Sequence, residues 1–230
     1  IFIGRLGSDD FGKQFIAQFN KLGVNLDFLQ LDYDSPTRVV NVDRDQFGDR
    51  FFSGFVPSSY SSFADEALSK KLIEKQLPNL KKFFLETKYL VTGTILLSSP
   101  QSKETILFLL ELANKFEVKI VIDLNWREVF WDYSSFSSKI SKTARINLIK
   151  KYLNHAHVLK LAKEEATLFF ENENPFLISK QMLKRPDVII TDGKNPVKWY
   201  INGLQGITKT PNSQRIVDTT GRRRRISSRA

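Results

Sequence analysis

The stretch Lys119-Ile120-Val121-Ile122-Asp123-Leu124-Asn125-Trp126-Arg127 places polar side chains directly after a short apolar run. Such a run is typical of a buried strand, and open α/β sheets bind their ligands outside the carboxyl ends of the strands. Asn125 and Arg127 are therefore candidates to hold hydroxyl or phosphate groups, Arg127 by a two-pronged contact. The alternative is an Arg–Asp pair that braces a loop.

Strands and helices alternate around this stretch, which predicts an α/β fold with a mostly parallel sheet covered on both faces. In the helix after the first of these strands, Ile106, Leu109, Leu110 and Ala113 should face inward. Asn202-Gly203 predicts a hairpin between the last two strands. The strands are expected over 89–97, 119–124, 158–161, 188–191, 197–201 and 206–209, and the helices over 103–116, 144–153, 163–171 and 176–184.

The first part of the chain has a different pattern. Residues 1–12 read as a strand end and a glycine turn, followed by a helix over 13–22. Phe15, Ile16, Phe19 and Leu22 form its apolar stripe. Residues 24–55 predict only strands, over 25–31, 37–43 and 50–55, and we expect them to form a separate lid. A helical stretch interrupted by Pro78 follows over 64–85.

Composition bounds the function. The 230 residues are 41% hydrophobic, which suits one domain with a sizeable core. The net charge is +10, but five arginines lie in residues 222–230, so the body is only mildly basic. The chain has no cysteine and hence no disulfide framework or thiolate metal site. We see no apolar run of transmembrane length and no signal peptide, and we expect a cytoplasmic protein without a membrane partner.

Several short motifs follow one another along residues 1–221, and singly each is common. In this order they resemble the ribokinase-like (PfkB) carbohydrate kinases, particularly the fructokinase-like members with Asp-x-Asn-x-Arg and a following Trp. The series is Gly4-x-x-Gly7-x-Asp9-x-x-Gly12, Leu22-Gly23-Val24, Thr37, Gly48-Asp49-Arg50, Asp123-x-Asn125-x-Arg127-x-x-x-Trp131, Lys160-x-x-x-x-Glu165, Thr191-x-Gly193 and Asp218-Thr219-Thr220-Gly221.

The resemblance implies a ribokinase-like three-layer αβα fold with a mostly parallel central sheet and a small β-strand lid at about 24–55. It implies ATP-dependent phosphorylation of a sugar hydroxyl, on fructose or a related sugar, with ATP, Mg²⁺ and K⁺ as cofactors. The partners would be the sugar and ATP, with no nucleic acid and no membrane, and the lid is a candidate homodimer contact.

The resemblance also assigns roles to individual residues. Glu165, which fits the spacing better than Glu164, would organise Mg²⁺ and phosphate through water. Ala162 stands where the family usually has Asn or Ser, and Pro196 where it often has Gly. The Gly7–Gly12 turn is structural in the family. The substrate-binding residues would be Asn125, Arg127 and Arg50; those on the nucleotide and cation side would be Lys160, Glu165, Thr191, Gly193, Asp218 and Thr219; and Gly221 would begin the anion hole.

The resemblance stops after Gly221. The family continues Ala-Gly-Asp-Ala-Phe, and its Asp takes the proton of the sugar hydroxyl. Here Arg224 stands at that position, and an arginine cannot act as the base. The family's first strand and its N-terminal Gly-Gly and Asn segment have no match either. We therefore expect the chain to be incomplete at both ends, and inactive as it stands.

A slip of the reading frame explains residues 222–230. The codons GCA GGC GAC GCA TTT CAT CAA GGG C encode Ala-Gly-Asp-Ala-Phe-His-Gln-Gly. One C in front makes them CGC AGG CGA CGC ATT TCA TCA AGG GC, which encodes Arg-Arg-Arg-Arg-Ile-Ser-Ser-Arg-Ala, the whole tail. Two other readings stay open: a pseudokinase that acts as a regulatory or scaffold protein, and nucleic-acid binding through the basic tail.

Sequencing the gene across the Gly221 codon tests the frameshift. We expect one extra nucleotide directly after that codon, whose removal restores the family's sequence. An intact frame would contradict the hypothesis and favour a pseudokinase. Nucleic-acid binding with a steep salt dependence, abolished by deleting residues 222–230, would favour the other reading.

Overall fold

The computed structural model describes residues 1–44, 50–56, 62–133 and 137–210. The predicted site residues Asp218, Thr219, Gly221 and Arg224 lie outside these ranges. Contacts divide the chain into two compact units. Unit 1 comprises Ile1–Lys88, Ile95–Val118 and Arg127–Arg145, and unit 2 comprises Tyr89–Thr94, Lys119–Trp126 and Ile146–Ala230.

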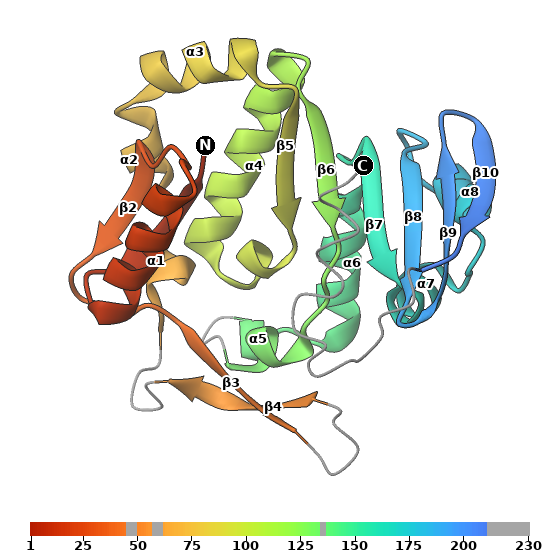
Figure 1. The fold of residues 1–230 in the computed structure, drawn as a ribbon, viewed down its shortest axis with the longest axis horizontal. Helices are drawn as coiled ribbons and strands as arrows, with labels where there is room; N and C mark the ends of the chain where they lie inside the picture. The colour runs from red at the N-terminus through yellow and green to blue at the C-terminus, as the bar shows by residue number, and fades with distance from the viewer. Residues whose placement is uncertain (45–49, 57–61, 134–136, 211–230) are drawn as a thin grey trace. The chain divides into compact units, whose positions relative to one another are not determined.

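Unit 2 contains a six-stranded sheet in the order β10-β9-β8-β7-β6-β5, whose strands lie side by side in Figure 1. The four strands β5 to β8 run parallel, whereas β9 and β10 are antiparallel. The predicted α/β fold with a mostly parallel sheet is thereby confirmed. The bounds are β5 Tyr89–Gly93, β6 Lys119–Asp123, β7 Val158–Ala162, β8 Asp187–Asp192, β9 Asn195–Ile201 and β10 Leu204–Thr208.

The helices of this part also lie close to their predicted places. They are α6 Lys142–Leu153, which begins in unit 1 and continues into unit 2, α7 Lys163–Phe170 and α8 Pro175–Gln181. The hairpin between β9 and β10 is confirmed at Asn202 (φ 50°) and Gly203 (φ 81°). Two successive positive φ angles define the hairpin turn whose twist matches that of the strands.

The core of unit 2 lies along its three central strands. Their inward side chains, Ile120, Ile122, Leu159, Leu161, Val188 and Ile190, are at most 2% exposed. Strands buried in this way carry near-continuous apolar runs, which is why the sequence pattern placed them correctly.

Unit 1 contains most of the helices. The predicted inward side chains of α4, namely Ile106, Leu109, Leu110 and Ala113, are buried as expected. Pro78 lies in the first turn of α3, where a missing N–H costs little. The elements are β1 Ile3–Gly7, α1 Asp10–Lys21, β2 Phe28–Asp32, β3 Val39–Arg44, β4 Arg50–Val56, the 3₁₀ helix η1 Ala64–Ala67, α2 Lys70–Glu74, α3 Leu77–Glu86, η2 Ile95–Ser98, α4 Pro100–Lys115, α5 Glu128–Tyr133 and η3 Ser137–Lys139.

The predicted lid at 24–55 has to be corrected. Only β3 and β4 form a separate antiparallel pair, over residues 39–56, whereas β2 pairs in parallel with β1. Strand pairing depends on distant residues, so the pattern of β2 alone could not assign it to one partner. The stretch Tyr89–Leu97 was likewise predicted as one strand, but β5 ends at Gly93 and η2 follows.

The glycine turn before α1 is structural, as predicted. Asp9 caps the helix: the Gly12 N–H donates to Oδ1 at 2.8 Å, and the Thr37 N–H donates to Oδ2 at 2.6 Å. Burial opposes ionisation of Asp9, but these hydrogen bonds outweigh it and hold the pKa below its usual value. The apolar stripe predicted for α1 is only partly buried, because Phe15 and Leu22 are 47% and 65% exposed.

None of the helices in the described ranges has the combination of length and apolar character that a membrane span requires.

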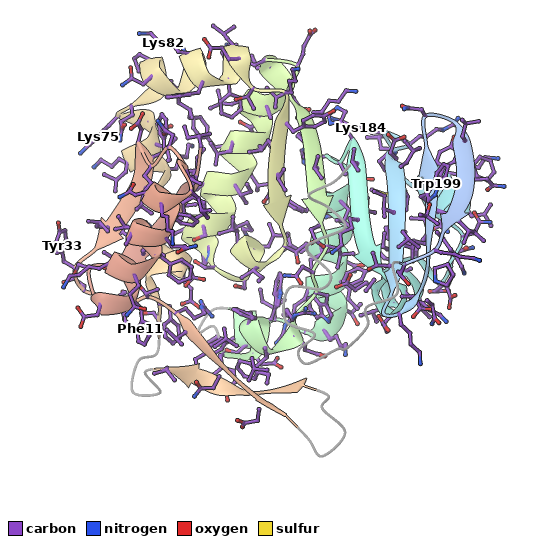
Figure 2. The ribbon with its side chains drawn as sticks, in the orientation of Figure 1. Phe11, Tyr33, Lys75, Lys82, Lys184 and Trp199 are labelled. Atoms are coloured by element: carbon purple, nitrogen blue, oxygen red, sulfur yellow. The ribbon has the colours of Figure 1, made fainter. Side chains whose placement is uncertain are left out.

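His157 lies just before β7, at the amino end of the sheet, near Lys184, which is labelled in Figure 2. Its Nδ1 accepts a hydrogen bond from the Ile120 N–H at 3.0 Å, which requires that nitrogen to be unprotonated. Burial lowers the pKa of His157, and the nearby charges of Lys184 and Lys119 lower it further. The residue therefore joins β6 to β7 in its neutral form.

We expect stability to fall in acid because of His157. Its folded pKa lies below the ordinary 6.5, so the unfolded chain binds more protons as the pH falls below that value. His157→Ala should lower the free energy of unfolding by about 0.5–1.5 kcal/mol near neutral pH. Urea unfolding at about pH 7.5 and about pH 5 should show this difference shrinking in acid. An equal difference at both pH values would contradict the assignment.

Candidate active site

Polar side chains from three neighbouring strands meet at one edge of the sheet in unit 2. Asp123 ends β6, Lys160 lies in β7 and Thr191 lies in β8. The register pairs Asp123 with Lys160, and Ala162 with Thr191. Asp123 ends its strand, Thr191 and Ala162 lie at or next to the ends of theirs, and Lys160 lies in the middle of β7. The carboxyl ends of parallel strands meet at one edge of the sheet, where α/β sheets bind ligands.

Lys160 and Asp123 form an ion pair at this edge. The Lys160 Nζ donates to both carboxylate oxygens of Asp123 at 2.8 Å. The Lys160 side chain is 9% exposed and that of Asp123 is 31% exposed. A buried ammonium needs such a partner, because an unpaired charge is costly to remove from water. The alternative interpretation of the sequence was an ion pair between Asp123 and an arginine. In the structure, the ion pair of Asp123 is with Lys160.

Glu165 is a buried carboxylate that joins two segments of unit 2. Its Oε1 accepts the Trp126 N–H and its Oε2 accepts the Ala162 N–H, both at 2.7 Å. Ala162 has no side chain that could cap α7, and Glu165 instead binds the backbone N–H at that position. The loop after β6 is thereby held against the start of α7. This structural role was not predicted, although Glu at the third position of a helix is a known capping signal.

Asn125 lies in the loop that Glu165 holds. Its backbone is left-handed, with φ 45°, a conformation that asparagine tolerates better than most residues. The next residue, Trp126, packs edge-to-face on Phe169 of α7 with ring centroids 5.7 Å apart. On the other side, the Leu124 N–H donates to the Lys160 carbonyl at 2.9 Å. The loop is therefore fixed on both sides of Asn125, which is half-buried.

Thr191 lies near the end of β8, and Gly193 lies in the turn that follows this strand. Thr191 is buried, and its hydroxyl donates to the Leu161 carbonyl at 3.4 Å. Gly193 has φ 50°, and a Cβ added there would meet no atom within 4 Å, so glycine is favoured by the backbone angle and not by crowding. The turn also carries Asp192, whose Oδ2 lies 3.5 Å from the Lys163 Nζ.

The other predicted substrate residues belong to unit 1. Arg127 is exposed, and its carbonyl accepts the Phe130 N–H at 3.0 Å, within the first turn of α5. Arg50 begins β4 opposite Arg44, and its side chain lies outside the described part of the structure. The structure therefore brings together six predicted residues within unit 2, namely Asp123, Asn125, Lys160, Glu165, Thr191 and Gly193, whereas Arg127 and Arg50 belong to unit 1.

The residues present do not fit a directly bound Mg²⁺. Within the described ranges, no group of three or more His, Asp or Glu side chains is placed to hold a metal ion. Each oxygen of Glu165 already accepts a backbone N–H, and Asp123 is bound by Lys160. Mg²⁺ requires near-octahedral oxygen ligands, which these groups do not provide.

The tryptophans serve packing. Trp131 is 1% exposed, and Trp126 packs on Phe169. Trp199, labelled in Figure 2, lies over Gly206, where an added Cβ would come within 2.4 Å of the indole ring. Its Nε1–H donates to the Thr208 hydroxyl at 2.9 Å, which fixes the ring on the hairpin.

Comparisons with known proteins show which family the chain resembles. A family model described as pfkB family carbohydrate kinase matches residues 1–221. The chain is 26% identical to a probable fructokinase-5 of Arabidopsis thaliana, over 96% of this chain and 63% of that protein. It is 29% identical to a fructokinase of Klebsiella pneumoniae, over 96% of this chain and 66% of that protein. The chain spans 50 to 66% of the length of the curated relatives it matches.

Solved structures show the same fold. The crystal structure of a fructokinase from Xylella fastidiosa matches with a TM-score of 0.75 at 22% sequence identity. The match covers 93% of this chain and 61% of the fructokinase chain. The same values hold for the structure of that fructokinase with bound ATP. The ribokinase-like fold predicted from the motif series is thereby confirmed.

Glu165→Gln should destabilise the protein, and Glu164→Gln is its matched control. The amide oxygen can replace one acceptor, but the amide nitrogen would face a second N–H donor in a buried place. We expect a loss of about 1.5–3 kcal/mol in the free energy of unfolding, measured by urea denaturation. Glu164 is exposed one residue away, and its change should cost less than about 0.5 kcal/mol. Equal losses would contradict the role given to Glu165.

Proposed function

Because the chain belongs to the pfkB family of carbohydrate kinases, we propose that the parent protein transfers a phosphoryl group from ATP to a hydroxyl of fructose or a related sugar. The observation that carries the proposal is the convergence of Lys160, Thr191 and the loop held by Glu165 at one edge of the sheet. Phosphoryl transfer depends mainly on positioning and charge stabilisation, and rigid groups at a strand edge suit both.

On the nucleotide side, the proposal uses Lys160, Thr191 and Gly193 from the described residues. The Lys160 ammonium has three donors, and Asp123 engages it through both carboxylate oxygens. A phosphate oxygen would be a further acceptor for this cation. Asp218 and Thr219 complete the nucleotide side in the proposal. The ATP-bound structure of the Xylella fastidiosa fructokinase supports ATP as the donor.

On the sugar side, the proposal uses Asn125, Arg127 and Arg50. Asn125 offers both an acceptor and donors to a hydroxyl, and its backbone is fixed by its neighbours. Arg127 is exposed at the start of α5, where its side chain is accessible to a ligand.

The general base is the decisive difference between the chain and the proposed parent. Gly221 would begin the anion hole, and an Asp three residues later would accept the proton of the sugar hydroxyl. Arg224 occupies that position. We therefore propose that the chain as given is inactive, and that restoring the frame restores the base.

Three further parts of the proposal concern the cations and the assembly. Mg²⁺ would arrive with the ATP phosphates, since the described residues provide no direct site, and K⁺ is a second candidate cation. A homodimer would form through the β3–β4 sheet, where Val40 and Val42 on one face of β3 are 38% and 47% exposed.

The test is a kinase assay on two proteins: the chain as given, and a restored protein that has the frame corrected after Gly221, the downstream sequence and the missing N-terminal segment. Both are assayed with ATP against a panel of hexoses, pentoses and nucleosides. We expect the restored protein to phosphorylate fructose or a close relative and the given chain to show no turnover. A folded, restored protein without turnover across the panel would overturn the proposal.

In the restored protein, Arg127→Ala should act on the sugar side. Removal of the guanidinium should raise the KM for the sugar by roughly tenfold or more, because a charged hydrogen bond is lost. The KM for ATP should stay nearly constant. Steady-state kinetics with each substrate varied in turn measures both constants, and a collapse of ATP affinity with an unchanged sugar KM would show that Arg127 is wrongly assigned.

A pseudokinase is the second candidate, and Arg224 is the observation that favours it. If the gene has an intact reading frame and its product folds, the protein would lack the general base and would act through binding alone.

A further inference from the structure

Arg38 is a buried arginine that neither the motif series nor the proposed mechanism uses. It directly precedes β3, and its side chain is 6% exposed. Its Nε lies 3.1 Å from Asp65 Oδ1 and its Nη2 lies 2.7 Å from Glu66 Oε1. Both carboxylates come from η1, so the guanidinium joins the beginning of β3 to that helix.

Three aromatic rings enclose the same guanidinium. Its Cζ lies 4.9 Å from the ring centroid of Phe55, 4.7 Å from that of Phe63 and 5.0 Å from that of Phe130. Phe55 belongs to β4 and Phe130 to α5. The Nη1 atom is buried and makes no hydrogen bond within the described structure. Arginine suits such a place because its guanidinium is weakly hydrated and is attracted to ring faces.

The helix η1 that binds Arg38 is itself held firmly. The Ser99 hydroxyl donates to the Glu66 carbonyl, and the Ser102 hydroxyl donates to the Asp65 carbonyl at 2.7 Å. The Ala64 N–H donates to the Pro36 carbonyl at 2.9 Å. The backbone of η1 is thus fixed to the start of α4, and its two carboxylates form a stationary partner for Arg38.

The helix α5 contacts this cluster through Phe130 and Tyr133, besides its buried Trp131 and the ion pair of Asp132 with Arg145. It has six residues, and a helix of that length is not stable in water without tertiary contacts. Phe130 contacts the Arg38 guanidinium, and both Phe130 and Tyr133 pack on Phe55, with centroid distances of 5.0 Å and 5.2 Å. The Phe130 N–H binds the Arg127 carbonyl, so the position of Arg127 follows that of Phe130.

We propose that Arg38 is a positioning residue: it holds α5, and with it Arg127, against the base of the β3–β4 sheet. The part that concerns Arg127 and the sugar rests on the proposed function. The part that concerns α5 stands on the contacts of unit 1 alone, and the two are tested separately.

Hydrogen exchange followed by mass spectrometry tests the hold on α5. Arg38→Met keeps an apolar stem among the rings but leaves Asp65 and Glu66 without their cation. The triple variant Arg38→Met, Asp65→Asn, Glu66→Gln removes that charge imbalance and serves as the matched control. In both variants, amide exchange in residues 128–133 should rise by about tenfold or more, while α4 and β7 keep their protection. Unchanged exchange in 128–133 would overturn the proposal.

Arg38→Lys keeps the positive charge but not the planar contact with three rings, and it covers the case in which Arg38→Met does not fold. Its exchange in 128–133 should lie between the wild-type and Arg38→Met values, or above wild type if the methionine variant is unfolded. Protection equal to wild type would mean that charge alone suffices and would overturn the role given to the stacked guanidinium.

Kinetics of the frame-restored protein test the link to Arg127. Arg38→Lys should raise the KM for the sugar by several-fold to tenfold, with kcat and the KM for ATP changed by less than about twofold. A merely structural role would lower kcat through a smaller folded fraction and leave both KM values unchanged, and that result would overturn the link. If the restored protein phosphorylates no sugar, the proposed function fails, whereas the exchange measurement still decides the role of Arg38.

Discussion

Parallel pairing of the strands β5 to β8 is the constraint on which the candidate site depends. Strands that run in one direction end at the same edge, and the register brings Asp123 beside Lys160 and Ala162 beside Thr191. Residues that are far apart in the sequence thereby become neighbours in the sheet. The same arrangement explains why each motif in unit 2 follows an apolar run: the run forms the buried strand, and the motif begins where the strand leaves the core.

Buried charge then determines the local geometry at that edge. The Lys160 ammonium and the Glu165 carboxylate are both nearly inaccessible to water, and each is satisfied by two close contacts. Lys160 finds a carboxylate, whereas Glu165 finds two backbone N–H groups from different segments. The contacts of Glu165 restrict the conformation of the loop after β6, because this loop must place the Trp126 N–H next to the Glu165 carboxylate. The left-handed backbone of Asn125, directly before it, is consistent with that demand.

Unit 1 solves the burial of charge in another way. Arg38 is surrounded by ring faces as well as by two carboxylates, and one of its nitrogens makes no hydrogen bond in the described structure. The aromatic rings come from a strand, a loop and a short helix that have little stability of their own. A guanidinium can contact all of them at once because it is flat and weakly hydrated. In unit 2, parallel strands bring the site residues together. In unit 1, short elements pack around the single side chain of Arg38.

The sequence alone predicts the elements of unit 2 except the end of β5, the hairpin at Asn202-Gly203 and the glycine turn at Gly7–Gly12, because periodicity and turn residues are local properties. It also carried the motif order by which the family was recognised. It did not place β2, whose alternating pattern suits a lid strand as well as the parallel pair that it forms with β1. It did not predict that Lys160 binds Asp123, that Glu165 anchors a loop, or that Arg38 lies among three rings. Each of these depends on which distant group can satisfy a charge or a strand edge once water is excluded, and only the tertiary structure decides that.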